Sequence, residues 1–155
     1  ISNQNEVVLD MFSGIGQFSV PLAKYSNPKK VLAIEKNPMA YKYLVENVKL
    51  NDLTNVKPIL GDCTIKSPKK YANRVIMGYL FKTIKFLPFA LTALKDGGII
   101  HCHSIVHKSD FNTEKAKIKK FIEKSGYDLN KIDYRSIKSY SPFYYHIVYD
   151  IDISS

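Results

Sequence analysis

The chain has 155 residues, of which 45% are hydrophobic, 12% aromatic and 24% charged, and these values are typical of one globular domain with a buried core. It contains seven glycines and seven prolines, no low-complexity tract and no internal repeat, and no apolar run approaches the ~20 residues of a membrane span. Disordered, fibrous and membrane-spanning classes are therefore excluded, and we expect a soluble protein.

The net charge of +9 arises from 23 basic and 14 acidic residues, and 21 of the basic residues are lysines. Lysines attract phosphate without reading bases, a task that usually recruits arginine, so an anionic partner is one interpretation and a solvated lysine-rich surface is the other. Cys63 and Cys102 are too few for a disulfide framework and no secretory signal is visible, so we expect a cytoplasmic protein.

Short apolar runs alternate with helical patterns along most of the chain. Residues 7–9 form an apolar run that Asp10 and a glycine loop close, which predicts a buried parallel strand followed by a helix. Asn37 is a favourable N-cap and Pro38 a favourable first residue for a second helix, which Asn51 and Asp52 should end. The predicted strands are 7–9, 30–35, 56–60, 74–77 and 99–104, and the other predicted helices are 17–25, 87–94 and 113–125.

The pattern changes in the last part of the sequence. The segment 96–98, Asp-Gly-Gly, should end the helix that precedes the fifth strand. Two extended runs, 132–137 and 144–151, follow each other without a helix between them, so they should pair as an antiparallel hairpin at a sheet edge. The whole pattern predicts a Rossmann-like α/β fold, a doubly wound, mostly parallel seven-stranded sheet in one domain over residues 1–155.

Ligands of such sheets bind beyond the carboxyl ends of the strands, where the strand order reverses. The first strand is followed there by a loop with Gly14 and Gly16, which taken alone could be a plain tight turn. Glu35 lies 19 residues beyond Gly16 at the end of the second strand, where a carboxylate can accept both hydroxyls of a ribose. The ligand should therefore contain an adenosine-like nucleoside.

Two further acids distinguish between nucleoside ligands. Ser19 replaces the third glycine of the dinucleotide fingerprint, and Asp10 would repel a pyrophosphate but suits a ligand with an ammonium or sulfonium group. Asp62, at the end of the third strand, can accept the exocyclic amine of adenine while the backbone of Cys63 donates to a ring nitrogen. Together these residues favour S-adenosylmethionine over NAD.

The segments 10–19 and 35–38, with Glu46-Asn47 and Leu50-Asn51, resemble the catalytic domain shared by tRNA guanine-37 N1-methyltransferases and tRNA wybutosine-synthesising aminocarboxypropyltransferases. The resemblance implies the class I S-adenosylmethionine-dependent methyltransferase fold and tRNA as partner. After the fourth strand the methyltransferases carry an Asn-Leu-Pro type motif, whereas this chain has Gly78-Tyr79-Leu80. Residues 86–91 and 97–103 are similar to the aminocarboxypropyltransferase branch.

The aminocarboxypropyltransferase branch implies a specific reaction. It is transfer of the 3-amino-3-carboxypropyl group of S-adenosylmethionine to C7 of 4-demethylwyosine in tRNA(Phe), with release of methylthioadenosine. Guanine N1-methylation of tRNA is the leading alternative, and a non-catalytic RNA-binding scaffold with the same fold is the second. The resemblance also implies an RNA-recognition region upstream of Ile1, so we expect a catalytic fragment that binds tRNA weakly. Separately, we expect the protein to be a monomer.

The candidate site residues follow from these arguments. Tyr79 and His103 are candidates for a catalytic role, and Tyr79, Tyr140 and Phe143 are candidates for contact with a base. The candidate cofactor-binding residues are Asp10, Phe12, Ser13, Gly14, Gly16, Glu35, Lys36, Asp62, Cys63 and Gly78.

Histidines near the fifth strand raise the question of a metal. His101 and His103 share one face of that strand, but Cys102 points to the other, and the spacing matches no standard zinc pattern. We therefore expect no metal site, and we expect His101 to be a buried histidine with satisfied hydrogen bonds.

Overall fold

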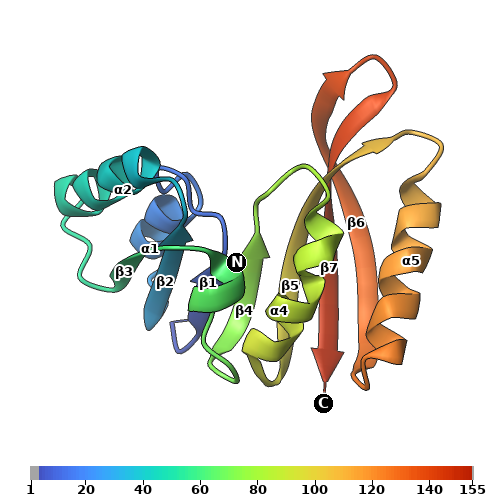
Figure 1. The fold of residues 1–155 in the computed structure, drawn as a ribbon, viewed down its shortest axis with the longest axis horizontal. Coiled ribbons are helices and arrows are strands. Elements are labelled where there is room, and N and C mark those ends of the chain that lie inside the picture. The colour runs from blue at the N-terminus through green and yellow to red at the C-terminus, as the bar shows by residue number, and fades with distance from the viewer. Residues whose placement is uncertain (1–3, 155) are drawn as a thin grey trace.

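The computed structural model describes residues 4–154, which form a seven-stranded sheet in the order β3-β2-β1-β4-β5-β7-β6 (Figure 1). The strands are β1 (Val7–Asp10), β2 (Lys30–Glu35), β3 (Val56–Leu60), β4 (Ala72–Met77), β5 (Leu94–His107), β6 (Asp128–Ser141) and β7 (Tyr144–Ser154). The helices are α1 (Ser19–Ser26), α2 (Pro38–Leu50), α3 (Cys63–Lys66), the 3₁₀ helix η1 (Thr83–Phe86), α4 (Leu87–Ala93) and α5 (Phe111–Lys124). The predicted sheet with its C-terminal antiparallel hairpin is confirmed.

The strand order reverses at β1. The chain moves outward from β1 through β2 to β3 and then returns to place β4 on the other side of β1, with all these neighbours parallel. β5 extends the parallel sheet beside β4, and β7 is antiparallel to both of its neighbours, β5 and β6. A crevice beyond the carboxyl end of β1 is the expected place for a ligand in such a sheet.

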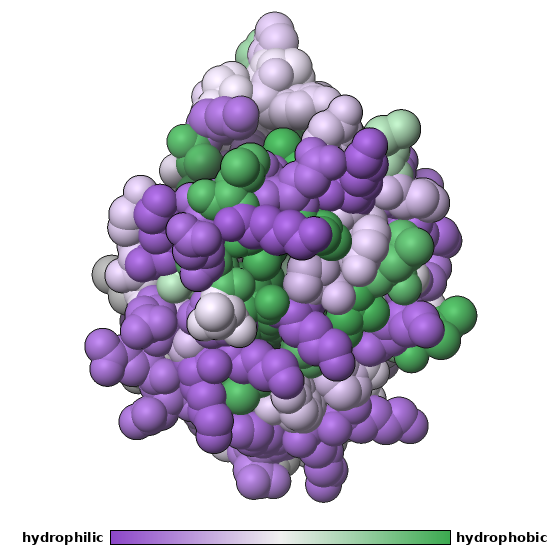
Figure 2. All heavy atoms as spheres, turned by 90° about the vertical axis from the view of Figure 1, so that its left-hand side faces the viewer, coloured by the Kyte–Doolittle hydropathy of each residue, from purple (hydrophilic) through white to green (hydrophobic). Residues whose placement is uncertain are grey.

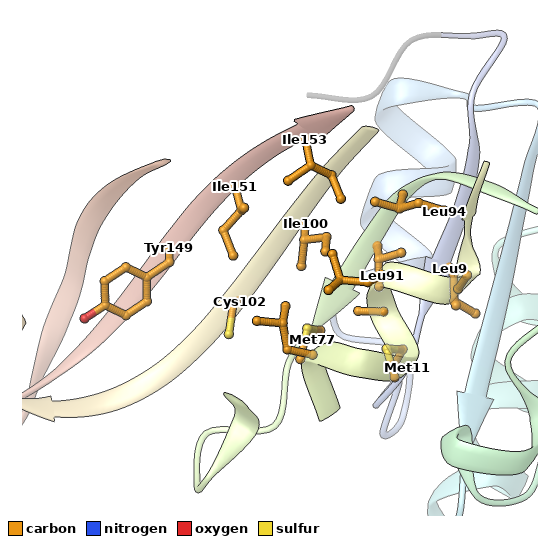
Figure 3. Packing of buried hydrophobic residues seen from close by; sticks show 14 of the residues in the cluster. Leu9, Met11, Met77, Leu91, Leu94, Ile100, Cys102, Tyr149, Ile151 and Ile153 are labelled. Atoms are coloured by element: carbon orange, nitrogen blue, oxygen red, sulfur yellow. The ribbon is translucent and has the colours of Figure 1, made fainter. Parts of the chain in front are cut away.

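Helices cover both faces of the parallel strands, which explains why these strands read as continuous apolar runs. On one face, α1 and α2 contribute Ala23, Leu44 and Val48 to a cluster with Val8 and Val31. On the other face, α4 and α5 pack against the larger cluster. Figure 3 shows part of that cluster, in which side chains from α4 pack together with side chains from β1, β4, β5 and β7; the labelled residues are Leu9, Met11, Met77, Leu91, Leu94, Ile100, Cys102, Tyr149, Ile151 and Ile153.

The capping prediction for α2 is confirmed. The side chain of Asn37 accepts hydrogen bonds from the backbone N–H groups of Met39 (2.9 Å) and Ala40 (3.3 Å), and Pro38 is the first helical residue. The capped first turn places Glu35, two residues before the cap, at the mouth of the crevice.

Two other helices begin at different residues from those predicted. α1 begins at Ser19 rather than at residue 17, and Pro21 then lies in the first turn, where its missing N–H has no partner to lose. α5 begins at Phe111, two residues earlier than predicted. No helix among residues 4–154 has the length and apolar character that crossing a membrane requires.

The prediction that residues 96–98 end a helix is wrong. α4 ends at Ala93, and Gly97 and Gly98 lie inside β5 with φ values of +127° and +143°. A Cβ atom at Gly98 would lie 2.1 Å from the carbonyl oxygen of Asn73, at the point where the pairing of β4 with β5 shifts register. Glycine is present here because the neighbouring backbone approaches too closely for any side chain.

The hairpin strands are longer than predicted, 128–141 and 144–154 rather than 132–137 and 144–151, and β5 likewise begins before residue 99 and ends after residue 104. β6 lies at the sheet edge, and Ile132 is the one buried residue in this strand. An edge strand with polar side chains on both faces has little apolar alternation, so its ends are hard to detect in the sequence.

Candidate active site

A cavity of about 520 Å³ lies beyond the carboxyl ends of β1 to β4, where the strand order reverses. Its volume is in the range of small-molecule sites. The lining residues are Met11, Phe12, Gly14, Glu35, Lys36, Gly61, Asp62, Cys63, Gly78, Tyr79, Leu80, Phe81 and Phe86. Figure 2 views the molecule from the side of β3 and α2 and shows hydrophobic side chains at the centre of this face with hydrophilic side chains around them.

Seven of the ten predicted cofactor-binding residues line this cavity, and so does the predicted catalytic residue Tyr79. The structure places Asp10, Ser13, Gly16 and the second predicted catalytic residue, His103, outside the lining. A direct contact of these four residues with a ligand remains a prediction.

The glycine loop follows β1 and borders the cavity. Ser13 donates its backbone N–H to the carbonyl oxygen of Ile34 (2.9 Å), which fixes the loop to the end of β2. Gly14 and Gly16 have φ values of +54° and +98°, and a Cβ atom at Gly16 would lie 3.0 Å from the Leu44 side chain. The loop is therefore more than a plain turn, because Gly16 also lets α2 approach closely.

Glu35 organises the mouth of the cavity through its two carboxylate oxygens. Oε2 accepts the backbone N–H of Gly14 (2.7 Å), and Oε1 accepts the backbone N–H of Asn37 (2.6 Å). A carboxylate oxygen has two acceptor positions, so each oxygen retains one for a ligand hydroxyl. The arrangement holds the carboxylate rigidly between the glycine loop and the start of α2.

Asp10 is fully buried beneath the glycine loop. Its carboxylate accepts hydrogen bonds from the Ser19 hydroxyl (2.7 Å) and from the backbone N–H of Phe12 (3.2 Å). Burial raises the pKa of Asp10 to about 6, although these hydrogen bonds act in the opposite direction. Asp10 thus connects the end of β1 with the start of α1 through Ser19, and its bond with Phe12 N–H holds the beginning of the glycine loop.

Asp62 and Lys36 form an ion pair at the cavity. The Lys36 ammonium lies 2.7 Å from Asp62 Oδ2, while Oδ1 accepts both the N–H and the hydroxyl of Thr64 as the N-cap of α3. The bond from Lys36 and those from Thr64 lower the pKa of Asp62 to about 2, so it is ionised at neutral pH. Burial raises the pKa of the neighbouring Cys63 thiol to about 11, which makes this cysteine a poor nucleophile.

Three aromatic rings form the apolar wall of the cavity. Phe12 stacks on Tyr79 with ring centroids 5.3 Å apart, and Phe86 meets both rings edge-on at 4.9 and 5.9 Å. The sequence argument missed Phe86, which comes from η1. A 3₁₀ segment has no helical apolar period to reveal it, so only its nearness to the end of β4 could have indicated a role.

His103 packs against Phe18, outside the cavity lining. A Cβ atom at Gly78 would be 3.0 Å from the Phe18 ring, and the centroids of the Phe18 and His103 rings are 4.8 Å apart. His103 is 8% exposed and its Nδ1 lies 2.8 Å from Nε2 of His146. Burial and the nearby His146 lower the pKa of His103 to about 4, so it is neutral at physiological pH.

His101 has the satisfied hydrogen bonds that were predicted, but it is only partly buried, with 19% of its side chain exposed, rather than buried as expected. Its Nε2 lies 2.7 Å from the guanidinium of Arg74, and its Nδ1 lies 2.5 Å from Asp150. Since arginine only donates, Nε2 accepts and Nδ1–H donates, which is the neutral tautomer. No group of three or more histidine, cysteine or acidic side chains suited to a metal ion occurs within the part of the chain that the structure describes.

Comparison with known proteins relates the sequence and the fold to one family. Residues 1–130 match the TRM5/TYW2 methyltransferase domain. The tRNA(Phe) (4-demethylwyosine(37)-C(7)) aminocarboxypropyltransferase of Methanocaldococcus jannaschii is 53% identical over 97% of this chain and 61% of that protein. The protein of the same name from Pyrococcus horikoshii is 39% identical over 99% of the chain and 55% of its own length.

The methyltransferase branch is also similar. The tRNA (guanine(37)-N(1))-methyltransferase Trm5b of Pyrococcus abyssi is 37% identical over 99% of this chain and 46% of that protein. Among solved structures, M. jannaschii TYW2 in complex with AdoMet superposes with a TM-score of 0.95 at 52% identity and covers 99% of this chain and 71% of that one. The chain spans 61% and 55% of the lengths of the two aminocarboxypropyltransferases named above, which is less than two thirds of each.

Proposed function

Because this chain belongs to the TRM5/TYW2 methyltransferase domain family, we propose that its cavity binds S-adenosylmethionine and directs the aminocarboxypropyl group to a tRNA base. The acceptor is C7 of 4-demethylwyosine in tRNA(Phe), and the nucleoside product is methylthioadenosine. The observation that carries the choice of reaction is the 53% identity to the M. jannaschii aminocarboxypropyltransferase, against 39% identity to the Trm5b of the same organism.

The lining residues fit the parts of S-adenosylmethionine. The free acceptor positions of Glu35 suit the two hydroxyls of a ribose. The ionised, part-exposed carboxylate of Asp62 suits the exocyclic amine of adenine. This contact requires Lys36 either to share the carboxylate with the amine or to move aside. The wall of Phe12, Tyr79 and Phe86 suits the cationic sulfonium, since aromatic faces attract cations.

The sulfonium carries three carbons that a nucleophile can attack. In the proposed reaction C7 of the base forms a bond to the Cγ of the methionine moiety, the S–Cγ bond breaks, and its electron pair stays on sulfur as a neutral thioether. The base then loses the proton from C7 and recovers its aromaticity. Orientation alone selects the carbon, and alignment of reacting groups can contribute up to ~7–11 kcal/mol.

The loop after β4 supports the choice of product. Gly78, Tyr79 and Leu80 line the cavity beside the aromatic wall and offer no side-chain amide to grip the edge of a guanine. Gly78 keeps the backbone close to Phe18, so a larger residue would press on the Phe18 ring. Tyr79 is 44% exposed, which leaves part of its ring accessible to a base that enters the cavity.

Guanine N1-methylation is the second candidate, because Trm5b is also similar over nearly the whole chain. The two reactions leave different nucleosides. The protein is incubated with S-adenosylmethionine and tRNA(Phe) that carries 4-demethylwyosine, and the spent cofactor is separated by chromatography. Methylthioadenosine is expected; S-adenosylhomocysteine together with a methylated tRNA would refute aminocarboxypropyl transfer.

A matched control uses the same tRNA with guanosine at the modified position. The proposed enzyme should leave this tRNA unchanged, whereas a guanine methyltransferase should modify it. S-adenosylmethionine binding is measured separately by calorimetry, so that failure of the tRNA to bind is distinguished from failure of the cofactor site.

A further inference from the structure

The tip of the β6–β7 hairpin lies beside the mouth of the cavity. Tyr144, the first residue of β7, pairs with His107 at the end of β5 and with Ser141 at the end of β6. The tip therefore stands at the same edge of the sheet as the carboxyl ends of the parallel strands, and Figure 1 shows it projecting beyond the rest of the sheet. Residues of the tip are near the cavity although the residues that line the cavity all come much earlier in the sequence.

Exposed aromatic rings connect the cavity with this tip. Phe81 lines the cavity and is 52% exposed, and its ring meets that of Tyr140 edge-on with centroids 6.0 Å apart. Phe143, in the turn itself, is 57% exposed. We call the group of Phe81, Tyr140, Phe143 and Lys108 the hairpin rim. Exposed apolar side chains that lie together and are bordered by polar residues often mark a binding surface.

The hairpin rim is positively charged. The Lys108 ammonium lies 4.8 Å from the centre of the Phe143 ring, and the Lys108 N–H donates to the carbonyl oxygen of Phe143 (2.8 Å). Two further lysines are exposed: Lys82 directly follows Phe81 in the sequence, and Lys138 is two residues before Tyr140. None of these three lysines takes part in an ion pair within residues 4–154, so their charge is available to a partner.

We propose that the hairpin rim stacks a nucleotide that flanks the modified base of the RNA. This inference rests on the proposed function, since it takes the acceptor in the cavity to be a base of RNA. A base that enters the cavity must leave its stack, at a cost that stacking of a neighbour on protein rings offsets. Aromatic faces accept any base, and unpaired lysines beside them meet the adjoining phosphates.

The test measures stacking directly. The probe is the anticodon stem-loop of tRNA(Phe) with 2-aminopurine placed on the 5′ side of the modified position in one RNA and on the 3′ side in another. Stacking on an aromatic ring quenches 2-aminopurine fluorescence. At low salt the protein should quench one of the two probes, and Tyr140→Ala should abolish the quenching and weaken binding about five- to hundredfold.

Two variants control for the fold and for non-specific effects. Tyr140→Phe retains a ring and should retain the quenching. Tyr25→Ala removes another exposed tyrosine, 80% exposed in the last turn of α1, at the opposite edge of the sheet, and should leave quenching unchanged. Lys82→Gln should lower the slope of affinity against salt, whereas Tyr140→Ala should leave that slope unchanged.

The outcomes separate this inference from the proposed function. Quenching that survives in Tyr140→Ala overturns the inference, and so does the absence of quenching with both probes. Concentration-dependent self-association that Tyr140→Ala abolishes would assign the hairpin rim to a protein contact instead. Calorimetry of S-adenosylmethionine on the unaltered protein needs no RNA, so loss of that binding would count against the proposed function alone.

Discussion

Substitution of Glu35 by alanine should weaken S-adenosylmethionine binding and destabilise the fold by separable amounts. The carboxylate would no longer accept a ribose hydroxyl, and charge-assisted hydrogen bonds contribute about 1.5–3 kcal/mol, so we expect roughly a ten- to hundredfold loss of affinity. The backbone N–H groups of Gly14 and Asn37 would also lose their acceptor. Since the Asn37 site is exposed, this second effect should cost only about 1–2 kcal/mol of stability.

A thermodynamic cycle distinguishes the direct hydrogen bond from distortion of the glycine loop. Calorimetry measures the affinity of the unaltered protein and of Glu35→Ala for S-adenosylmethionine and for an analogue that lacks the ribose 2′ hydroxyl. If Glu35 accepts that hydroxyl, the analogue binds the unaltered protein about tenfold more weakly, but the variant binds both ligands within about twofold of each other.

Urea unfolding measures the cost to the fold. Glu123→Ala on α5 is the matched control, because this exposed acid has only a distant partner, Lys119 at 3.8 Å, and should change neither measurement. Equal affinities of the unaltered protein for the two ligands, or losses that add fully in the variant, would refute the placement of the ribose at Glu35.

Three further predictions concern the protein without ligand or with tRNA. The raised pKa of Asp10 means that the folded state binds a proton at this carboxylate more tightly than the unfolded state does, so the stability that this group contributes falls as the pH rises from about 4 to 6. Measured by urea unfolding, the stability of Asp10→Asn should therefore increase by about 2–3 kcal/mol relative to that of the unaltered protein between pH 4 and 7. A stability difference that stays constant over this range would contradict the assignment. Gly98→Ala should lower the free energy of unfolding by at least about 2 kcal/mol, because its Cβ would meet the Asn73 carbonyl. Gly126→Ala, where φ is +80° and no atom lies near the Cβ position, should lower it by only about 1–2 kcal/mol. Equal losses of stability would argue against the close approach at Gly98. Filter binding across a salt series should show weak tRNA binding with a strong salt dependence and little preference among tRNAs, and tight selective binding by this chain would overturn that expectation.

Much of the fold could be predicted because its parallel strands are buried on both faces. Such strands appear in the sequence as short apolar runs, and the Asn37–Pro38 cap marks the start of α2 without reference to the rest of the chain. Gly97 and Gly98 were misinterpreted because a helix stop and a close backbone approach call for the same residue. Only the position of Asn73 across the sheet distinguishes them, and that is a tertiary relation.

The sequence predicted the candidate site about as well as it predicted the fold. Topology brings the ends of parallel strands together, so Glu35 and Asp62 could be placed at the cavity from their positions at strand ends alone. The direction of a side chain could not be inferred in the same way. Asp10 was expected to face the ligand, but the structure directs its carboxylate to Ser19, under the loop. The hydroxyl of a helix that begins nine residues later in the chain decides that orientation.

The interior position of β7 also has a consequence for the order in which the protein can fold during synthesis. β7 is made after every other described strand, yet it pairs with β5 on one side and β6 on the other, and it carries the buried Tyr149, Ile151 and Ile153. While the ribosome is still adding residues 144–154, β5 presents an open edge and its apolar face lacks these neighbours. The nascent sheet is therefore exposed to mispairing until the last strand emerges, and slow translation across this segment should lengthen that period.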